Sequence, residues 1–313
     1  MDRPLLSICI PTYNRASWLE KILVKMLEVC SNNNIHIYIS DNASPDNTQE
    51  VGERFQNQYK FIHYFHHEAN IGPDDNFEFV LKMADTKYRW LMSDTCYVDG
   101  IGDLISDLQS GEYDGYILNA PGSRGQSLPK EKKTYTESIS IMRDMGWHLS
   151  WISCMIYNES LIKVMNFGRY KDSSFNQTAL MFEPTANRPC RIAFNPNVIV
   201  KNLPSRMKES KWQYHVFDVM YRQWYIMIMS LPLYYPYETK VKCIEDNAKY
   251  PNVLTMRLHL RRRTEGKWHL ADVMRNKFFI KQAKGNFWTL VLIGLIPVSI
   301  LRLTKTIKNV FKK

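Results

Sequence analysis

The chain has 313 residues, of which 45% are hydrophobic, so it is long enough and apolar enough to bury a sizeable core, and global disorder is excluded. Its net charge of +10 is concentrated at one end, because residues 257–313 hold 14 Lys and Arg against two acids, which leaves 27 basic and 29 acidic residues elsewhere. The six cysteines show no CxxC or CxxH spacing, which argues against a zinc site or a disulfide framework.

The first hundred residues alternate predicted strands and helices. LLSICI (5–10) is an apolar run of strand length, and residues 17–30 repeat apolar side chains every 3.6 residues, as a helix does. IHIYIS, KFIHYFHH and YRWLMSD predict three more strands, with helices in NTQEVGERFQNQ and PDDNFEFVLKMADT. This order predicts an α/β fold with a mostly parallel, doubly wound sheet.

Each predicted strand is followed by a polar cluster: PTYNR, DNAS, NIGPDDN and SDT in turn. Taken singly, these clusters are typical of turns and helix caps. Doubly wound sheets bind ligands beyond the carboxyl ends of their strands, where all four clusters fall. Together they therefore predict a ligand site at this edge. The short apolar run in MDRPLLSICIP does not match a secretory signal, so we expect a cytosolic protein.

These segments resemble the inverting family 2 glycosyltransferases of the Rossmann-like GT-A fold, in the abequosyltransferase-like branch of bacterial O-antigen and capsule enzymes. The match lies in SICIPTYNRASWLEKIL, YISDNASPDNT, NIGPDDNF and YRWLMSD, and extends more weakly through LSWISCMIYNESLI and YKDSSFNQTALMFE. The resemblance implies a catalytic domain over residues 1–205, with a nucleotide-sugar half over 1–100 and an acceptor half over 101–205. Residues 206–313 would form an aromatic and basic helical extension.

The resemblance also implies a donor site. Asp41 would hydrogen-bond the nucleobase, and Pro11, Thr12 and Tyr13 would form one wall of the pocket. Arg15 would meet a phosphate or serve as a solvated surface charge. The full donor set expected is Pro11, Thr12, Tyr13, Arg15, Asp41, Asn42, Asn70, Gly72, Asn76, Ser93 and Asp94.

Asp94 matches the last acid of the family's metal-binding motif. Family members place two or three acids there, whereas this chain reads Ser93, Asp94, Thr95 and Cys96, with one carboxylate. Mn²⁺ or Mg²⁺ can be held by one carboxylate together with diphosphate oxygens and waters, so we expect a divalent cation at Asp94. The alternatives are Lys or Arg side chains in place of the metal, or an impaired enzyme.

An inverting transfer needs a base for the acceptor hydroxyl. Asp172, at a predicted helix start, is the expected base, and a helix N-cap is the alternative interpretation. Weaker candidates are Glu183, Asp74 and Asp75. His148 and Trp151 are expected acceptor contacts, with packing as the alternative for both. Trp147 could likewise contact a sugar ring or pack in the core.

The extension ends in an apolar run, residues 287–303, that contains Pro297 and carries no charge before Arg302. A spanning helix needs about 20 apolar residues, so this run, with basic residues on both sides, predicts an interfacial or re-entrant membrane anchor over 285–313. The alternatives are a buried C-terminal helix and a dimerisation helix.

The expected activity is therefore that of a hexosyl- or deoxyhexosyltransferase with a nucleotide-sugar donor and a polyprenyl-diphosphate-linked glycan acceptor, at the cytoplasmic face of the bacterial inner membrane. One alternative is a GT-A protein that binds a nucleotide sugar or glycan without turnover. A basic nucleic-acid-binding protein is disfavoured, because the 287–303 run is rich in Leu, Ile and Val rather than charge. The sugar, the nucleobase and the oligomeric state stay open.

Overall fold

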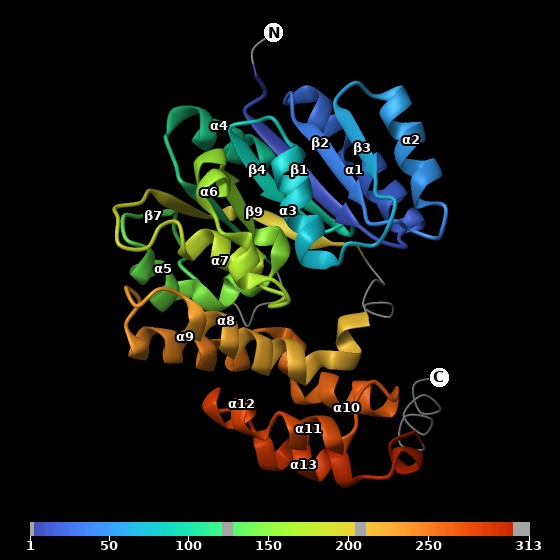
Figure 1. Ribbon diagram of the computed structural model, residues 1–313, viewed down its shortest axis with the longest axis vertical. Coiled ribbons are helices and arrows are strands. Elements are labelled where there is room, and N and C mark those ends of the chain that lie inside the picture. The colour runs from blue at the N-terminus through green and yellow to red at the C-terminus, as the bar shows by residue number, and fades with distance from the viewer. Residues whose placement is uncertain (1–2, 121–127, 204–210, 303–313) are drawn as a thin grey trace.

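The computed structural model describes residues 3–120, 128–203 and 211–302. A nine-stranded sheet in the order β3-β2-β1-β4-β8-β6-β9-β5, with β7 paired to β9, lies above a helical extension (Figure 1). The strands are β1 Leu6–Thr12, β2 His36–Asp41, β3 Ile62–His66, β4 Tyr88–Leu91, β5 Cys96–Asp99, β6 Gly115–Asn119, β7 Lys133–Tyr135, β8 Met155–Asn158 and β9 Ile192–Asn202.

Thirteen α-helices lie in the described residues, seven of them before the last strand. These seven are α1 Ala16–Asn32, α2 Thr48–Gln58, α3 Pro73–Met83, α4 Ile101–Ser110, α5 Ser138–Met145, α6 Glu159–Val164 and α7 Asn176–Phe182. The extension holds α8 Trp224–Ser230, α9 Tyr237–Lys249, α10 Met256–Thr264, α11 Leu270–Arg275, α12 Lys277–Gln282 and α13 Phe287–Leu295.

The N-terminal part of the sheet has the predicted topology. Strands β3, β2, β1 and β4 are all parallel, and α1, α2 and α3 connect them. In this register Thr12 lies opposite Asp41, so the ends of β1 and β2 meet at one edge.

The expectation of a mostly parallel sheet is wrong for the rest of the molecule, where the sheet is mixed. Strand β8 is antiparallel to both β4 and β6, and β5 and β7 are antiparallel to β9. Ser153, just before β8, accepts a hydrogen bond from the Trp90 indole at its carbonyl and one from the Ser93 N–H at its hydroxyl. Because β8 begins where β4 ends, it can only run antiparallel to β4.

Each face of the sheet is covered by its own core. On one face, α1, α2 and α4 bury residues such as Leu19, Phe55 and Leu104. On the other, a single cluster runs from Cys9 on β1 to Ile293 on α13. The extension therefore shares a continuous hydrophobic core with the second face of the sheet.

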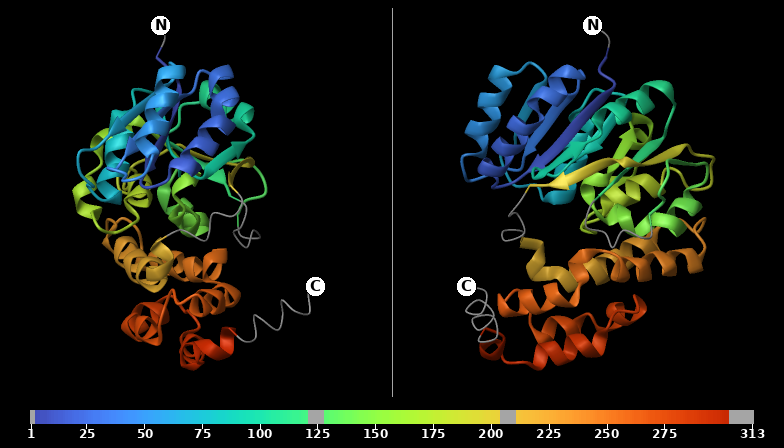
Figure 2. Two further views of the ribbon diagram at one scale, coloured as in Figure 1. Left: turned by 90° about the vertical axis from the view of Figure 1, so that its right-hand side faces the viewer. Right: turned by 180° about the vertical axis from the view of Figure 1, so that it is seen from behind.

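The extension is helical, as predicted, and forms two layers. Helices α8 and α9 lie next to the sheet domain, and α10 to α13 lie beyond them (Figure 2). The expected domain boundary at residue 205 lies outside the described residues, as do residues 303–313 of the expected anchor. Helix α13 ends at Leu295, ahead of Pro297, which splits the apolar run as proline does in a helix. Among the described residues, no helix combines the length and apolarity that crossing a bilayer requires.

Candidate functional site

A hydrogen bond joins the ends of two neighbouring parallel strands. The Thr12 hydroxyl, at the end of β1, donates to Asp94 Oδ2 over 3.0 Å. Asp94 follows β4 and is 8% exposed. Since Thr12 also lies opposite Asp41, three adjacent strands bring Asp41, Thr12 and Asp94 to one edge, as the parallel topology predicts.

Asp41 is fully buried, and its carboxylate is held by its own chain. Oδ1 accepts from the Ser44 N–H at 3.0 Å and from the Ser44 hydroxyl. Oδ2 accepts from the Tyr64 hydroxyl at 2.6 Å and lies 3.0 Å from His66 Nδ1. Burial and the bond to Asp41 raise the pKa of Tyr64. A carboxylate accepts about four hydrogen bonds, so a nucleobase would have to displace one of these donors from Asp41. The base-reading role stays a prediction.

The residues after β2 and β3 are tied together by Asn42. Its side chain donates to the Gly72 carbonyl at 3.0 Å and accepts from the Ile71 N–H at 2.8 Å. Asn70 accepts from the Gly72 N–H at 3.0 Å. Gly72 has a φ of 87°, a conformation that side chains rarely adopt, and α3 begins at the next residue. Asn42, Asn70 and Gly72 thus form one loop beside Asp41.

The remaining expected donor residues are spread over this edge. Asn76 is buried and bonded to Ser40 through both ends of its amide, at 2.5 and 3.2 Å, which is a packing role in this structure. Pro11 is half-buried, and Tyr13 is 39% exposed. The Arg15 N–H donates to Thr48 Oγ1 at 3.2 Å, so the turn after β1 is docked on the start of α2.

Asp94 is the carboxylate of the expected metal position. The Ser93 hydroxyl donates to Asp94 Oδ1 at 3.4 Å and lies 2.8 Å from the Thr95 hydroxyl. These are hard oxygen donors of the kind that Mg²⁺ and Mn²⁺ prefer. Within residues 3–120, 128–203 and 211–302, no group of three or more His, Cys, Asp and Glu could hold a metal by itself. The chain therefore fits a cation that takes most of its ligands from elsewhere.

Three of the four acids considered as general bases, Asp74, Asp75 and Asp172, meet at the N-terminus of α3. The fourth, Glu183, follows α7 and pairs with Arg169 at 3.4 Å. Lys171 pairs with Asp75 at 2.7 Å, and Asn176 donates to the Asp74 carbonyl at 3.1 Å. Asp172 is exposed in the loop before α7 and has a φ of 64°. Helix α7 begins at Asn176, so the alternative of Asp172 as its N-cap is wrong.

Asp74 is the buried member of this cluster. It is 6% exposed, and its Oδ1 has no hydrogen-bond partner among the described residues. Burial raises the pKa of Asp74 to about 6, the charges of Asp172 and Asp75 add to this, and backbone N–H groups of Ser174 and Asp172 oppose it. A carboxyl group with a pKa in this range can exchange a proton near neutral pH.

His148 and Trp147 lie in the core. The His148 Nε2–H donates to the Leu118 carbonyl at 2.8 Å, and burial lowers the pKa of His148 to about 4, so the ring is neutral. Trp147 is 3% exposed, and the centre of its ring lies 5.2 Å from that of Tyr250. In this structure Trp147 therefore packs in the core, which was the alternative interpretation. Trp151 is half-buried against both cores. His148 is 3% exposed, so it offers little surface to an acceptor in this structure.

Four residues that organise this edge were not among the predicted ones: Ser44, Tyr64, His66 and Ser153. Ser44 belongs to the polar cluster DNAS and could have been included on that ground. Tyr64 and His66 stand in a segment that reads as an ordinary strand, and Ser153 stands in an apolar one. Nothing in the local sequence shows that their side chains reach Asp41 and Ser93.

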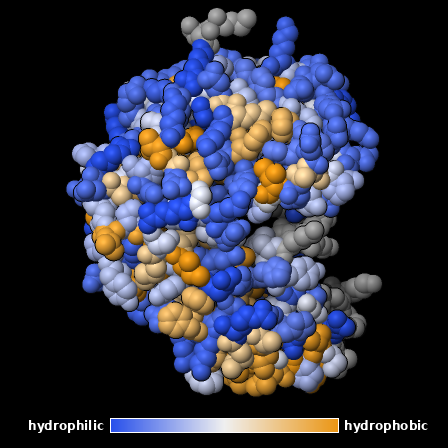
Figure 3. Space-filling view, viewed as in Figure 1, coloured by the Kyte–Doolittle hydropathy of each residue, from blue (hydrophilic) through white to orange (hydrophobic). Residues whose placement is uncertain are grey.

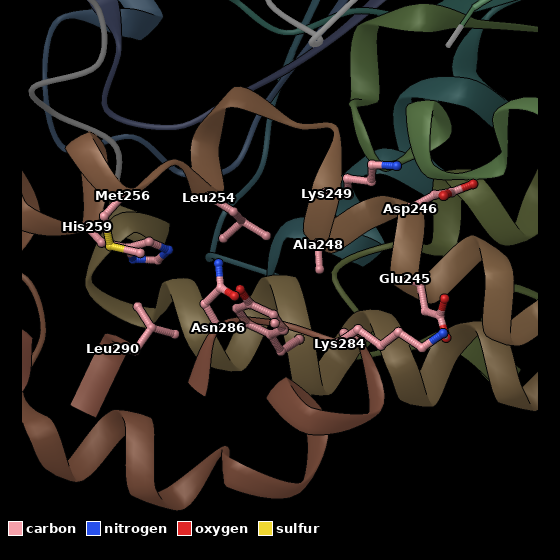
Figure 4. A pocket seen from close by; sticks show the side chains of 13 residues that line it. Glu245, Asp246, Ala248, Lys249, Leu254, Met256, His259, Lys284, Asn286 and Leu290 are labelled. Carbon is pink, nitrogen blue, oxygen red and sulfur yellow. The ribbon is translucent and has the colours of Figure 1, made fainter. Parts of the chain in front are cut away.

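A separate cavity of about 460 Å³ lies within the extension, between α9, α10 and α13 (Figure 4). His259, 1% exposed, lines it with an Nδ1 that has no partner in the described part of the chain. Lys284 pairs with Glu245 at its rim, at 2.9 Å. None of the residues predicted for the donor or acceptor lines this cavity.

The sequence comparisons agree with the resemblance. The model of glycosyl transferase family 2 matches residues 7–165. The chain is 43% identical over 173 residues to the abequosyltransferase RfbV of Salmonella typhimurium, an alignment that covers 53% of this chain and 47% of that protein. It thus spans about half the length of this curated relative.

Solved structures share the fold. Residues 1–349 of TarS from S. aureus superpose with a TM-score of 0.57 at 17% identity, covering 96% of this chain and 87% of that one. The mannosyltransferase PcManGT from Pyrobaculum calidifontis, solved with GDP-Man and Mn²⁺, gives a TM-score of 0.58 at 13% identity over 99% of this chain and 81% of that one. The GT-A-like fold is therefore confirmed with its mixed sheet. Because the family model matches more than half of its residues, this chain belongs to glycosyl transferase family 2.

Proposed function

We propose that this chain transfers a hexosyl or deoxyhexosyl group, with inversion, from a nucleoside diphosphate sugar to a polyprenyl-diphosphate-linked glycan of an O-antigen or capsule. The Thr12–Asp94 hydrogen bond carries the proposal, because it assembles polar side chains at the carboxyl edge of three parallel strands. The activity of the abequosyltransferase relative and the UDP-GlcNAc and GDP-Man bound to TarS and PcManGT support a nucleotide-sugar donor.

The departing nucleoside diphosphate gains negative charge, which something at the site must stabilise. A Mn²⁺ or Mg²⁺ ion bound by Asp94, the donor diphosphate and waters would supply that stabilisation as a Lewis acid. Thr12 and Ser93 each donate a hydrogen bond to the Asp94 carboxylate, so they restrain its orientation at this edge of the sheet. The Mn²⁺ in the PcManGT complex supports this assignment.

Asp172 is the proposed general base. It is exposed, as a residue that meets an incoming hydroxyl must be, and it is held in a left-handed conformation. Asp74 positions it, because its buried carboxyl receives the backbone N–H groups of Asp172 and Ser174. The Lys171–Asp75 ion pair fastens the same loop to α3 from outside.

The lipid-linked acceptor and the cytoplasmic face of the inner membrane belong to the same proposal. A soluble donor and an acceptor held at the inner leaflet would meet there. The basic excess of residues 257–313 supports contact with an anionic leaflet rather than with nucleic acid, because it accompanies an apolar run.

The first experiment is a thermal-shift titration of the full chain with UDP, GDP, CDP and dTDP and with their sugars, each with and without Mn²⁺. A ligand at 100 times its dissociation constant adds about 2.7 kcal/mol of stability, which is readily seen. We expect one base to stabilise the protein, Mn²⁺ to increase the shift, and Asp94→Asn to abolish that increase. Asp103→Asn, an exposed acid on α4, is the matched control and keeps the wild-type response. Folded protein that responds to none of these ligands contradicts the proposal.

The single carboxylate after β4 also favours a second candidate, a protein that binds nucleotide sugars without turnover. Release of nucleoside diphosphate in the presence of lipid-linked acceptor separates the two. Binding of donor without release, in wild-type protein and Asp172→Asn alike, would select the non-catalytic function.

A further inference from the structure

The end of the extension carries an unusual share of exposed apolar side chains. Six of the fifteen large exposed hydrophobic residues in the described chain fall within residues 274–300. We call them the outer face: Met274, Phe278, Trp288, Leu292, Leu295 and Ile300, which are between 50% and 70% exposed. Scattered single residues of this kind are normal on a protein surface, but a local group indicates a contact with another apolar phase.

Helix α13 is apolar on both sides. Phe287, Leu290 and Ile293 are buried against the extension. Trp288, Leu292 and Leu295, spaced four and three residues apart, point away from it and are 62% to 70% exposed. A surface helix ordinarily carries polar or charged residues on its outer side, and a helix that is apolar all round is covered by something.

The charges around the outer face all have one sign in the sequence. Between residues 273 and 302 there are five basic residues and no acid: Arg275, Lys277, Lys281, Lys284 and Arg302. Two acids from outside this stretch reach it, since Glu245 pairs with Lys284 at 2.9 Å and Asp272 lies 4.0 Å from Arg275. Lys281 and Trp288 line the same shallow hollow of about 300 Å³. An apolar surface with basic flanks is complementary to an anionic lipid surface.

The position of this face suits a surface contact. Helices α11 and α13 form the end of the molecule opposite the N-terminus, with α10 and α12 between them and α8 and α9 (Figure 1). Hydrophobic residues gather over α11 and α13 at that end, with hydrophilic ones beside them (Figure 3). The layer of α8 and α9 lies between this end and the nine-stranded sheet.

We propose that the outer face lies in the interfacial region of an anionic bilayer, with Trp288, Leu292 and Leu295 among the acyl chains and Lys277 and Lys281 at the phosphates. The molecule thus docks on the membrane through one side of α13 without spanning it. This inference rests on the proposed function for its biological setting, since a lipid-linked acceptor places the substrate at the same surface.

A second copy of the chain is the other apolar partner available. A two-fold symmetric contact places the same patch on both sides of the interface, so the lysines that flank the outer face would approach those of the second copy. Such like-charge contact is unfavourable, whereas anionic lipid neutralises the same lysines. The charge pattern therefore favours the bilayer.

Vesicle co-sedimentation of the full chain tests the proposal. We expect binding to vesicles of phosphatidylglycerol and phosphatidylcholine, and much weaker binding to phosphatidylcholine alone. The double variant Trp288→Glu/Leu292→Glu should bind the mixed vesicles about tenfold more weakly or worse. Lys277→Gln/Lys281→Gln should lose about fivefold per lysine on the mixed vesicles and change little on neutral ones.

A matched control comes from exposed apolar residues elsewhere. Val164 and Leu233 are 68% and 98% exposed, so Val164→Glu/Leu233→Glu adds the same charge away from the outer face and should bind as wild type does. Equal binding by the outer-face and control variants overturns the proposal. So does a wild-type chain that ignores vesicles but forms a dimer that Trp288→Glu/Leu292→Glu dissociates.

Donor binding in buffer separates this inference from the proposed function, because the donor edge lies in the sheet domain. Each folded variant should keep the nucleotide-induced thermal shift of wild type. Donor binding without vesicle binding refutes only the proposal that the outer face contacts a membrane. Vesicle binding without any donor response refutes only the proposed transferase function.

Discussion

The raised pKa of the buried Asp74 carboxyl group predicts that the stability of the folded protein depends on pH in an unusual way. The carboxyl group is 6% exposed, and its pKa is raised to about 6 from 3.8, chiefly by burial. The folded protein therefore holds this proton more tightly than the unfolded chain does. The stabilisation is fully present below pH 3.8 and is lost as the pH rises through about 6.

The magnitude follows from the two pKa values. Each unit of difference corresponds to about 1.4 kcal/mol, so ionising Asp74 above pH 7 costs the folded state about 3 kcal/mol. The N-terminus of α3 favours a negative charge by about 0.3–1 kcal/mol, which reduces this figure to between about 2 and 3 kcal/mol. Asp74→Asn removes the titration. Because Oδ1 has no partner among the described residues, the amide nitrogen can take its place while the carbonyl oxygen still accepts from the backbone.

Urea denaturation of the full chain at a series of pH values from 5 to 8 measures this effect. We expect the advantage of Asp74→Asn over wild type to grow with pH up to about pH 7 and then to level off at about 2–3 kcal/mol. Asp103→Asn, an exposed acid on α4, is the control: its charge is not among the causes of the raised pKa of Asp74, so it should show no such trend. A difference between Asp74→Asn and wild type that does not change with pH would refute the reasoning.

Three further predictions follow from burial and hydrogen bonding. Asp41→Ala should weaken nucleotide binding several-fold in calorimetry and lower the melting temperature as well, since it strands Ser44 and Tyr64; unchanged affinity would remove Asp41 from the donor site. All six cysteines are buried, and burial raises the pKa of Cys9 and Cys30 to about 12, so Ellman's reagent should react with native protein only after unfolding; a rapid thiol in native protein would contradict the packing. Trp224→Ala, at a fully buried position, should cost about 3–5 kcal/mol in urea denaturation, and a loss under 1 kcal/mol would show that the extension packs less tightly.

Local patterns predicted the N-terminal half of the fold because each element there has a strong signal. Helix α1 shows the expected 3.6-residue period, with Leu19, Ile22, Leu23 and Met26 buried. The strands after residue 95 are mostly four or five residues long, and β8 is joined to the end of β4 by a hydrogen bond from the Ser93 N–H to the Ser153 hydroxyl, sixty residues away. Such long-range contacts leave no periodic trace, so the antiparallel part of the sheet was not predicted.

The candidate site divides in the same way. The meeting of Thr12, Asp41 and Asp94 follows from parallel topology alone, because strand ends share an edge. The hydrogen bonds that occupy the Asp41 carboxylate come in part from Tyr64 and His66, which are side chains of β3. The contact between the Asp172 loop and α3 joins residues about a hundred positions apart. Sequence therefore identified the edge, and only the structure distinguishes a residue facing solvent, such as Asp172, from one committed to its own chain, such as Asp41.

The charge distribution relates the donor site to the outer face. The acids Asp94, Asp172, Asp74 and Asp75 all belong to the segments that follow β3 and β4 or precede α7, and Lys171 is already paired with Asp75. A nucleoside diphosphate approaching these carboxylates is repelled unless a cation accompanies it. The basic excess of the chain, meanwhile, belongs to residues 257–313, most of which fold into the layer farthest from the sheet. Most of the basic excess therefore lies away from the donor edge and near the outer face, where the proposed lipid contact would use it.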